Sequence, residues 1–378
     1  MGWEALGTSV INIEGIEMKG YKRFLSTIVV AFLSSAAFSA ESPEFAEKVI
    51  QAHELTESQA NKLRKIVTSR YGLTRNIGTE DEKAFRGPNN SYHPVSRGQC
   101  RKKVLETGII QPSKANEEAC KAKWMAPIPD AEGKASVCID QFEFPNIPCE
   151  YPVVWVPSNT AHKICQSMGK RLCSSHEWEG ACAGRIDPIA SYRFDIANKN
   201  ARRKAVNANR EKVWAYQSQP ELADKTDSRV LCGVYSGKDP DVLPGARANI
   251  KASSIAGISK GCVPHKSAYK TCGTNTWPSG YKYRCKSKQG VYDMHGNLAE
   301  VVNLPSHKGN LAKGGITGFT ERKGSFFVDR STIKRRGGVP KYPDDCRVRQ
   351  PYEHMKEVKY DTGHSFYQEG FRCCKDIL

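Results

Sequence analysis

Fourteen cysteines in 378 residues constrain the fold of this chain more than any other feature of its sequence. None of them forms a Cys-x-x-Cys pair, the spacing typical of structural zinc sites. An even number of cysteines is typical of a disulfide framework in an oxidising compartment, although a count leaves the pairing open. Cys100 and Cys120 are close enough in sequence for a local bridge. The adjacent Cys373 and Cys374 should not pair with each other, because so small a ring is strained.

The N-terminus has the pattern of an export signal. A basic start, "MKGYKRF" from Met18, precedes the apolar run "LSTIVVAFLSSAAFSA". Ala37 and Ser39 are small residues that fit cleavage after Ser39, so we interpret residues 1–39 as a signal peptide whose natural start is Met18. The apolar run is too short to span a membrane comfortably. We therefore expect a secreted or periplasmic protein with no transmembrane anchor, in which disulfides are favoured.

The charge of the chain indicates the kind of partner it meets. Lysine and arginine number 57 against 40 acidic residues, which gives a net charge of +17. Such a surface favours an anionic ligand or protein partner. The densest basic stretches, residues 198–212 and 330–336, lack the interleaved aromatic residues of a nucleic-acid platform, which argues against nucleic acid.

The order of local patterns predicts a helical N-terminal extension followed by a mixed α+β domain. "SP" at residues 42–43 and the capping box "TESQ" at residues 56–59 predict two helices. We expect residues 41–135 to form this extension and residues 136–378 the main domain. In the domain, residues 136–146 and 151–157 read as strands, and helices should begin at Ser158 and Ser174. Residues 185–285 are expected to be a loop-rich insertion.

Four motifs in the same order resemble the formylglycine-generating enzyme (sulfatase-modifying factor) superfamily. The family's "GKRLPTEAEWEYA" appears as "GKRLCSSHEWEGAC" at residues 169–182, and its "GLYDMAGNVWEW" as "GVYDMHGNLAEVV" at residues 290–302. Its "RGGSW" is similar to "KGGIT" at residues 313–317, and its "GFRCA" to "GFRCC" at residues 370–374. "CIDQFEFPN" at residues 138–146 resembles a cysteine-rich exported branch. The resemblance implies an α+β, C-type-lectin-like fold with little regular secondary structure.

The same resemblance implies a structural calcium ion and one disulfide. By position in the family motif, calcium would be held by the side chains of Asp293 and Glu300 and the backbone carbonyls of Gly296 and Leu298. The residues alone are equally typical of a turn whose acids accept hydrogen bonds from nearby amides. The family pattern also implies that Cys373 pairs with Cys182, which would leave Cys374 to reach Cys165 or Cys173.

The catalytic motif of the family is incomplete in this chain. The family's enzyme holds copper with two cysteines separated by four residues, the second of which begins a Cys-x-x-Arg stretch. "CRVR" at residues 346–349 places Cys346 at the second position, but the first is Lys341. The iron enzymes of the superfamily depend on a histidine-rich partner domain, and the nine histidines here show no i,i+4 pair.

These observations predict an exported, non-catalytic binding or scaffold module for an anionic partner outside the cytoplasm. The alternative is a copper-dependent formylglycine-generating-type oxidase that acts on a protein cysteine with Cys346 as a catalytic ligand, or a related iron-dependent oxidase. Fold resemblance alone does not separate the two, because one fold hosts many functions.

Overall fold

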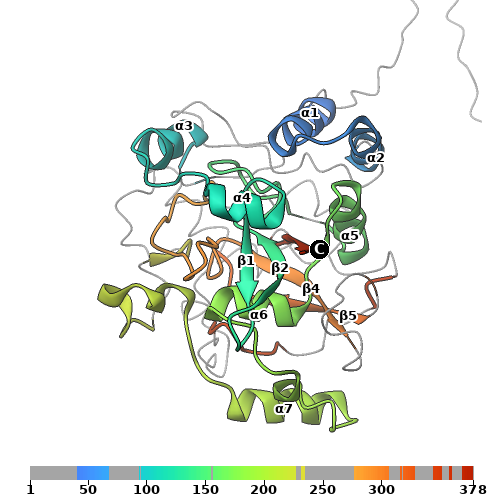
Figure 1. Ribbon diagram of the computed structural model, residues 1–378, viewed down its shortest axis with the longest axis vertical. Helices are drawn as coiled ribbons and strands as arrows, with labels where there is room; N and C mark the ends of the chain where they lie inside the picture. The colour runs from blue at the N-terminus through green and yellow to red at the C-terminus, as the bar shows by residue number, and fades with distance from the viewer. Residues whose placement is uncertain are drawn as a thin grey trace, which may run out of the picture. The chain divides into compact units, whose positions relative to one another are not determined.

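A computed structural model describes residues 41–67, 93, 95–154, 156–226, 231–234, 276–305, 316, 318–327, 344–350, 357–359 and 368–377 (Figure 1). The predicted signal peptide lies outside these residues. Within them, no helix is both long enough and apolar enough to cross a membrane.

The first two helices begin where local capping predicts. Helix α1 spans Glu41–His53 and α2 spans Glu57–Val67. Thr56 and Gln59 exchange the two hydrogen bonds of the predicted capping box, since each side-chain oxygen accepts from the other residue's backbone N–H. Phe45 and Val49 of α1 are buried, as the apolar spacing predicts.

Short helices and two small sheets make up the rest of the described chain. The helices are α3 (Arg97–Cys100), continued by a π-helical turn (Arg101–Leu105), α4 (Lys114–Cys120), α5 (Ser158–Ser167), α6 (Ser175–Ala183) and α7 (Lys199–Asn209). Three 3₁₀ turns, η4 (Ile189–Tyr192), η5 (Ala215–Ser218) and η6 (Pro220–Leu222), lie around α7 in sequence. This architecture confirms the predicted α+β class with little regular secondary structure.

The first sheet has the order β1-β2-β7-β3, formed by Met125–Pro129, Ala135–Asp140, Cys373–Asp376 and Arg171–Leu172, with every pair antiparallel. The second has the order β5-β4-β6, formed by Gly318–Lys323, Ala299–Pro305 and Glu369–Gly370. In it β4 pairs antiparallel with β5 and parallel with β6. Helix α6 packs against β1, β2, β4 and β5, so it contacts both sheets (Figure 1).

Three expectations about local structure differ from the fold. Residues 151–154, 156 and 157 do not form the predicted strand, because Pro152 and Pro157 have no N–H for a ladder. Conversely, β1 contains two prolines and still forms, since it is the edge strand of its sheet. Helix α7 lies in the predicted loop-rich segment and has no buried residue, so no apolar stripe could announce it.

Six disulfides join the twelve cysteines that the structure describes. The pairs are Cys100–Cys149, Cys120–Cys138, Cys165–Cys373, Cys173–Cys374, Cys182–Cys346 and Cys232–Cys285. Cys262 and Cys272 lie outside the described residues. A framework of disulfides is therefore correct for these cysteines, although the Cys100–Cys120 bridge is wrong.

The predicted Cys182–Cys373 bridge is also wrong, and strand geometry gives the reason. Cys373 and Cys374 are consecutive in β7, so their side chains point to opposite faces of the sheet. Cys373 faces the cluster that contains Cys165 of α5, whereas Cys374 faces the cluster that contains Cys173 and α6. Cys182 of α6 therefore lies on the Cys374 side and pairs with Cys346. The Cys173–Cys374 bridge is one of the two alternatives that the sequence left open.

Candidate functional site

The turn that begins at Gly290 is held closed by buried acids. Asp293 adopts a left-handed φ of 58°, and its Oδ2 accepts a hydrogen bond from the Gly280 N–H at 2.7 Å. Glu143 accepts from the Leu298 N–H at 2.9 Å and from the Asn297 side-chain amide at 2.6 Å. Burial raises the pKa of Asp293 to about 7 and the pKa of Glu143 well above its usual range. The acids act here as hydrogen-bond acceptors for backbone amides.

The predicted calcium ligands do not fit these contacts. Both oxygens of Glu300 accept from the buried Arg372 guanidinium at 2.6 Å, and Oε2 also accepts from Trp178 Nε1 at 3.0 Å. A ligand carboxylate that is already neutralised by arginine has little left to offer a hard cation. The set Asp293, Gly296, Leu298 and Glu300 therefore supports no further step that involves calcium.

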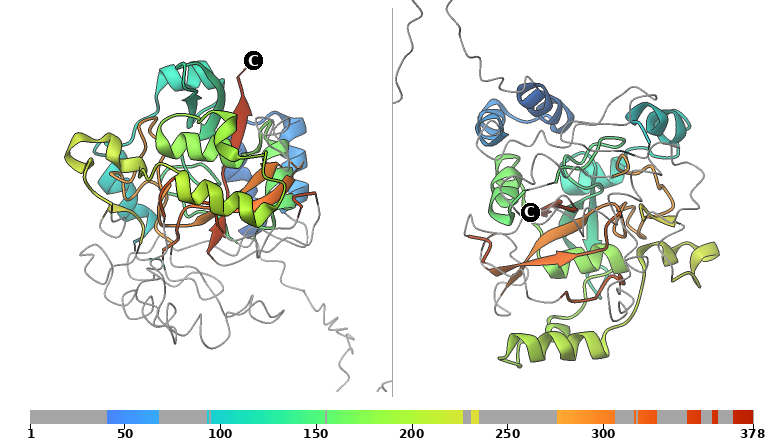
Figure 2. Two further views of the ribbon diagram at one scale, coloured as in Figure 1. Left: turned by 90° about the horizontal axis from the view of Figure 1, so that it is seen from below. Right: turned by 180° about the vertical axis from the view of Figure 1, so that it is seen from behind.

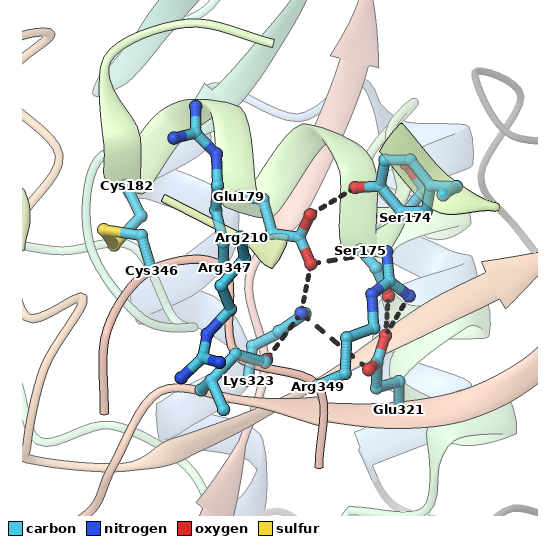
Figure 3. Close-up of polar contacts among 12 residues, drawn as sticks. Ser174, Ser175, Glu179, Cys182, Arg210, Glu321, Lys323, Cys346, Arg347 and Arg349 are labelled. Carbon is cyan, nitrogen blue, oxygen red and sulfur yellow. Dashed lines mark hydrogen bonds and ion pairs between the residues drawn. A yellow bond between two sulfur atoms is a disulfide. The ribbon is translucent and has the colours of Figure 1, made fainter. Parts of the chain in front are cut away.

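Cys346 lies in a buried group that joins three segments of the chain. Its sulfur is bonded to that of Cys182, at the end of α6, and both face His295 from the turn (Figure 3). His295 Nε2 is 3.5 Å from Cys182 Sγ and 3.8 Å from Cys346 Sγ. Among the described residues, this is the one group of three cysteine, histidine or acidic side chains whose ligand atoms lie within 4.8 Å of one another.

Hydrogen bonds fix the orientation of the His295 ring. Nδ1 lies 2.8 Å from the Asp344 carbonyl oxygen, to which it can only donate. Nε2 accepts from the Ala215 N–H at 2.9 Å. Burial lowers the pKa of His295, so the ring is neutral with its proton on Nδ1. The lone pair of Nε2 therefore faces the two sulfurs and the Ala215 amide.

A cavity of about 200 Å³ lies next to this group, between α6, η4, α7 and residues 347–349. Its lining is rich in arginine, but acids neutralise these arginines. Both Arg347 Nη atoms donate to acids, Nη2 to Asp187 at 2.7 Å and Nη1 to Glu211. Arg210 donates twice to Asp345, at 2.9 and 2.7 Å. The cavity is thus not a ready-made anion site.

Behind the cavity, a buried ion network links α6 to β5 and to the segment that follows Cys346. Lys323 is fully buried, pairs with Glu179 and donates to the Val348 carbonyl oxygen at 3.0 Å (Figure 3). Arg349 lies 3.1 Å from Glu321 and 3.4 Å from Glu179. Burial alone would raise the pKa of Glu179, but Arg349 and Lys323 hold it below its ordinary value. The sequence offered no signal for this network, since its members lie up to 170 positions apart.

A larger cavity of about 490 Å³ lies between the α1–α2 junction, α4, the end of α5 and Lys375. Its lysines are also engaged. Lys170 donates to Asp140 at 2.6 Å, and Lys375 donates to the carbonyl oxygens of Cys120 and Lys121 at 3.0 and 2.9 Å.

Exposed basic side chains concentrate on and beside α7. Residues 185–212 contain eight lysines and arginines against three acids. Lys204 in α7 and Lys212 just after it are exposed, and α7 lies on the outside of the domain (Figure 2). This surface, residues 185–212, is called the α7 surface below.

Comparison with known proteins places the chain in a family. The FGE-sulfatase family model, described as a sulfatase-modifying factor enzyme 1-like domain, matches residues 80–377. No curated protein matches the chain. The match covers well over half of the sequence and includes every motif on which the resemblance rests. The chain therefore belongs to the FGE-sulfatase family of sulfatase-modifying factor enzyme 1-like domains.

Proposed function

We propose that this chain is a non-catalytic member of its family, which binds an anionic partner outside the cytoplasm through the α7 surface. The observation that carries the proposal is the state of Cys346. Its sulfur, at the position of a copper ligand in the family's enzyme, is bonded to Cys182 and is fully buried. A disulfide sulfur carries no thiolate, and the thiolate is the form that binds a metal or acts as a nucleophile.

The compartment agrees with this assignment. Six disulfides within the described residues are typical of an oxidising location outside the cytoplasm. Secretion or delivery to the periplasm, as the N-terminal pattern predicts, would provide that location.

Charge distribution favours the α7 surface as the place where the partner binds. The arginines that line the smaller cavity are paired with acids, and two lysines of the larger cavity are occupied by Asp140 and by backbone carbonyls. Exposed lysines such as Lys204 and Lys212 remain available to a partner in solvent. Clustered exposed cations attract polyanions over a Debye length, about 8 Å at physiological salt.

The test uses a sulfated polysaccharide column and a salt gradient. Lys204→Glu with Lys212→Glu should elute at clearly lower salt than the unmodified protein. Lys62→Glu with Lys134→Glu, at two exposed lysines elsewhere, changes the net charge equally and is the matched control. Equal loss in both double variants would show that net charge alone drives binding and would overturn the assignment to the α7 surface.

The oxidase alternative makes the opposite prediction for Cys346. A copper-dependent enzyme needs two free thiols, one of them at Cys346. Native protein is treated with an alkylating reagent, digested, and examined for labelled cysteine peptides. We expect no label on Cys182 or Cys346. Label on both would remove the basis of the non-catalytic proposal and would make metal loading the next measurement.

A further inference from the structure

The Cys182–His295–Cys346 group has the donor set of a metal site, although it currently closes as a disulfide. Two sulfurs and one imidazole nitrogen come from α6, the turn after Gly290 and the segment before Arg347. The family's paired cysteines, with four residues between them, are absent here because position 341 is lysine. The group is therefore specific to the cysteines and the histidine of this chain.

The spacing of the three donors matches tetrahedral coordination on two of its three edges. Zinc–sulfur bonds of about 2.3 Å and zinc–nitrogen bonds of about 2.0–2.1 Å place sulfur and nitrogen ligands about 3.6 Å apart. The observed distances from His295 Nε2 to the two sulfurs are 3.5 and 3.8 Å. Only the third edge has to change, since the bonded sulfurs must separate to about 3.8 Å.

The histidine is oriented as a metal ligand usually is. Metal-binding imidazoles typically donate their second N–H to a carbonyl or carboxylate, which fixes the ring and its tautomer. His295 does so through Nδ1 to the Asp344 carbonyl oxygen at 2.8 Å. The ion would replace one contact of Nε2, the hydrogen bond from the Ala215 N–H at 2.9 Å. The ring itself has no need to rotate.

We infer that Cys182, His295 and Cys346 form a redox-gated site for a thiophilic d¹⁰ metal ion such as Zn²⁺. The oxidised state is the disulfide and holds no ion. A dithiol reductant converts it: two electrons and two protons pass to the Cys182 and Cys346 sulfurs, the S–S bond breaks, and the dithiol becomes a disulfide. Binding of the ion then releases the two thiol protons to solvent.

The donor set selects against hard cations. Thiolate and imidazole ligands prefer zinc and related soft ions, whereas calcium and magnesium require oxygen ligands. Three protein ligands leave one position for water or a substrate atom, as in catalytic zinc sites. Because Cys182 and Cys346 are 1% and 0% exposed, the ion enters during folding, before the two sulfurs are oxidised. The site is independent of the anionic partner proposed for the α7 surface.

The test refolds the reduced, full-length protein in a glutathione redox buffer that contains Co²⁺, a spectroscopic substitute for zinc. We expect one tightly bound Co²⁺ per chain and a thiolate-to-cobalt charge-transfer absorption. Peptide mapping should then show Cys182 and Cys346 as alkylatable thiols and the other five described disulfides intact. Chains that form those five disulfides without cobalt absorption at any glutathione ratio would overturn the inference.

Two histidine variants separate ligation from folding. His295→Gln should lose the cobalt absorption and form the Cys182–Cys346 disulfide. His93→Gln removes an equally buried histidine that contacts Thr276, and it should keep the absorption. Equal cobalt binding by His295→Gln would refute the site.

If the variants do not fold, wild-type refolding kinetics decide the question. Zn²⁺ should delay formation of the Cys182–Cys346 disulfide selectively, and Mg²⁺ should not. No selective delay with Zn²⁺ would equally refute the site.

Discussion

At the scale of single residues, the turn after Gly290 shows how a motif can keep its form and change its chemistry. Its acids are buried with one arginine: Glu300 is neutralised by Arg372, while Asp293 and Glu143 accept hydrogen bonds from amides. Asp293 gains only a neutral donor for its charge. A buried carboxyl with a neutral donor is held in its protonated form to a higher pH than usual.

This environment predicts a pH dependence of stability. The pKa of Asp293 is raised from 3.8 to about 7, so the folded chain keeps a proton that the unfolded chain loses between about pH 4 and 7. The free energy of unfolding should therefore fall as pH rises through this window. Asp293→Asn should stabilise the protein at pH 8 relative to pH 5, by roughly 1.4 kcal/mol for each unit of pKa shift that it removes.

Urea denaturation at pH 5 and pH 8 measures the effect. Glu106→Gln, at an exposed acid, is the control and should leave the pH dependence unchanged. A wild-type protein whose stability rises from pH 5 to pH 8 at this position, with Asp293→Asn removing the rise, would contradict the assignment.

Cys346→Ser provides a second prediction at this scale. The change opens the Cys182–Cys346 bridge, which closes a loop of 164 residues, and should cost about 2–5 kcal/mol. Cys182→Ser with Cys346→Ser should cost about as much as either single change, because one bond is lost in each case. Thermal unfolding measures this, and a fully additive double variant would show that the two sulfurs are not bonded.

Local signals in the sequence were sufficient for residues whose contacts are local. The Ser174–Glu177 capping box is present as predicted, with the Ser174 N–H donating to Glu177 at 2.8 Å. The partners of Cys182 and Glu179 could not be predicted in the same way. They depend on which face of β7 each cysteine occupies and on contacts between segments far apart in sequence.

At the scale of elements, α6 is the helix that organises the candidate site. Glu179 lies one turn before Cys182 on α6, and the two connect the helix to β5 and to residues 346–349. Lys323 of β5 is the central cation, since it lies between Glu179, Glu321 and the Val348 carbonyl oxygen. Removing it would leave buried acids with reduced compensation.

Lys323→Met should therefore destabilise the fold by about 3–5 kcal/mol, although it replaces a charge by an apolar side chain of similar length. Lys134→Met, at an exposed lysine, should change stability by less than about 0.5 kcal/mol. Urea unfolding measures both. A neutral Lys323→Met variant would show that Arg349 alone compensates the two acids.

At the scale of the whole molecule, the helices that precede the family match are part of one core with the domain. The match begins at residue 80, whereas α1 ends at His53. Yet Phe45 and Val49 share a buried cluster with Ile164 of α5 and Cys373 of β7. Lys48 also pairs with Glu150, the acid that Arg97 contacts. These contacts predict that the helices unfold together with the domain.

Phe45→Ala tests this cooperation. Truncating the buried ring should cost about 3–5 kcal/mol, and the cost should appear as a shift of one cooperative transition. Glu44→Ala changes the exposed neighbour and is the control. If α1 and α2 were a separate module, Phe45→Ala would instead produce an early, small transition and leave the main one in place. Circular dichroism and tryptophan fluorescence, followed together, distinguish the results because most tryptophans lie beyond residue 120. Coincident shifts of both signals require one core, in which the N-terminal helices support the face of β7 that carries Cys373.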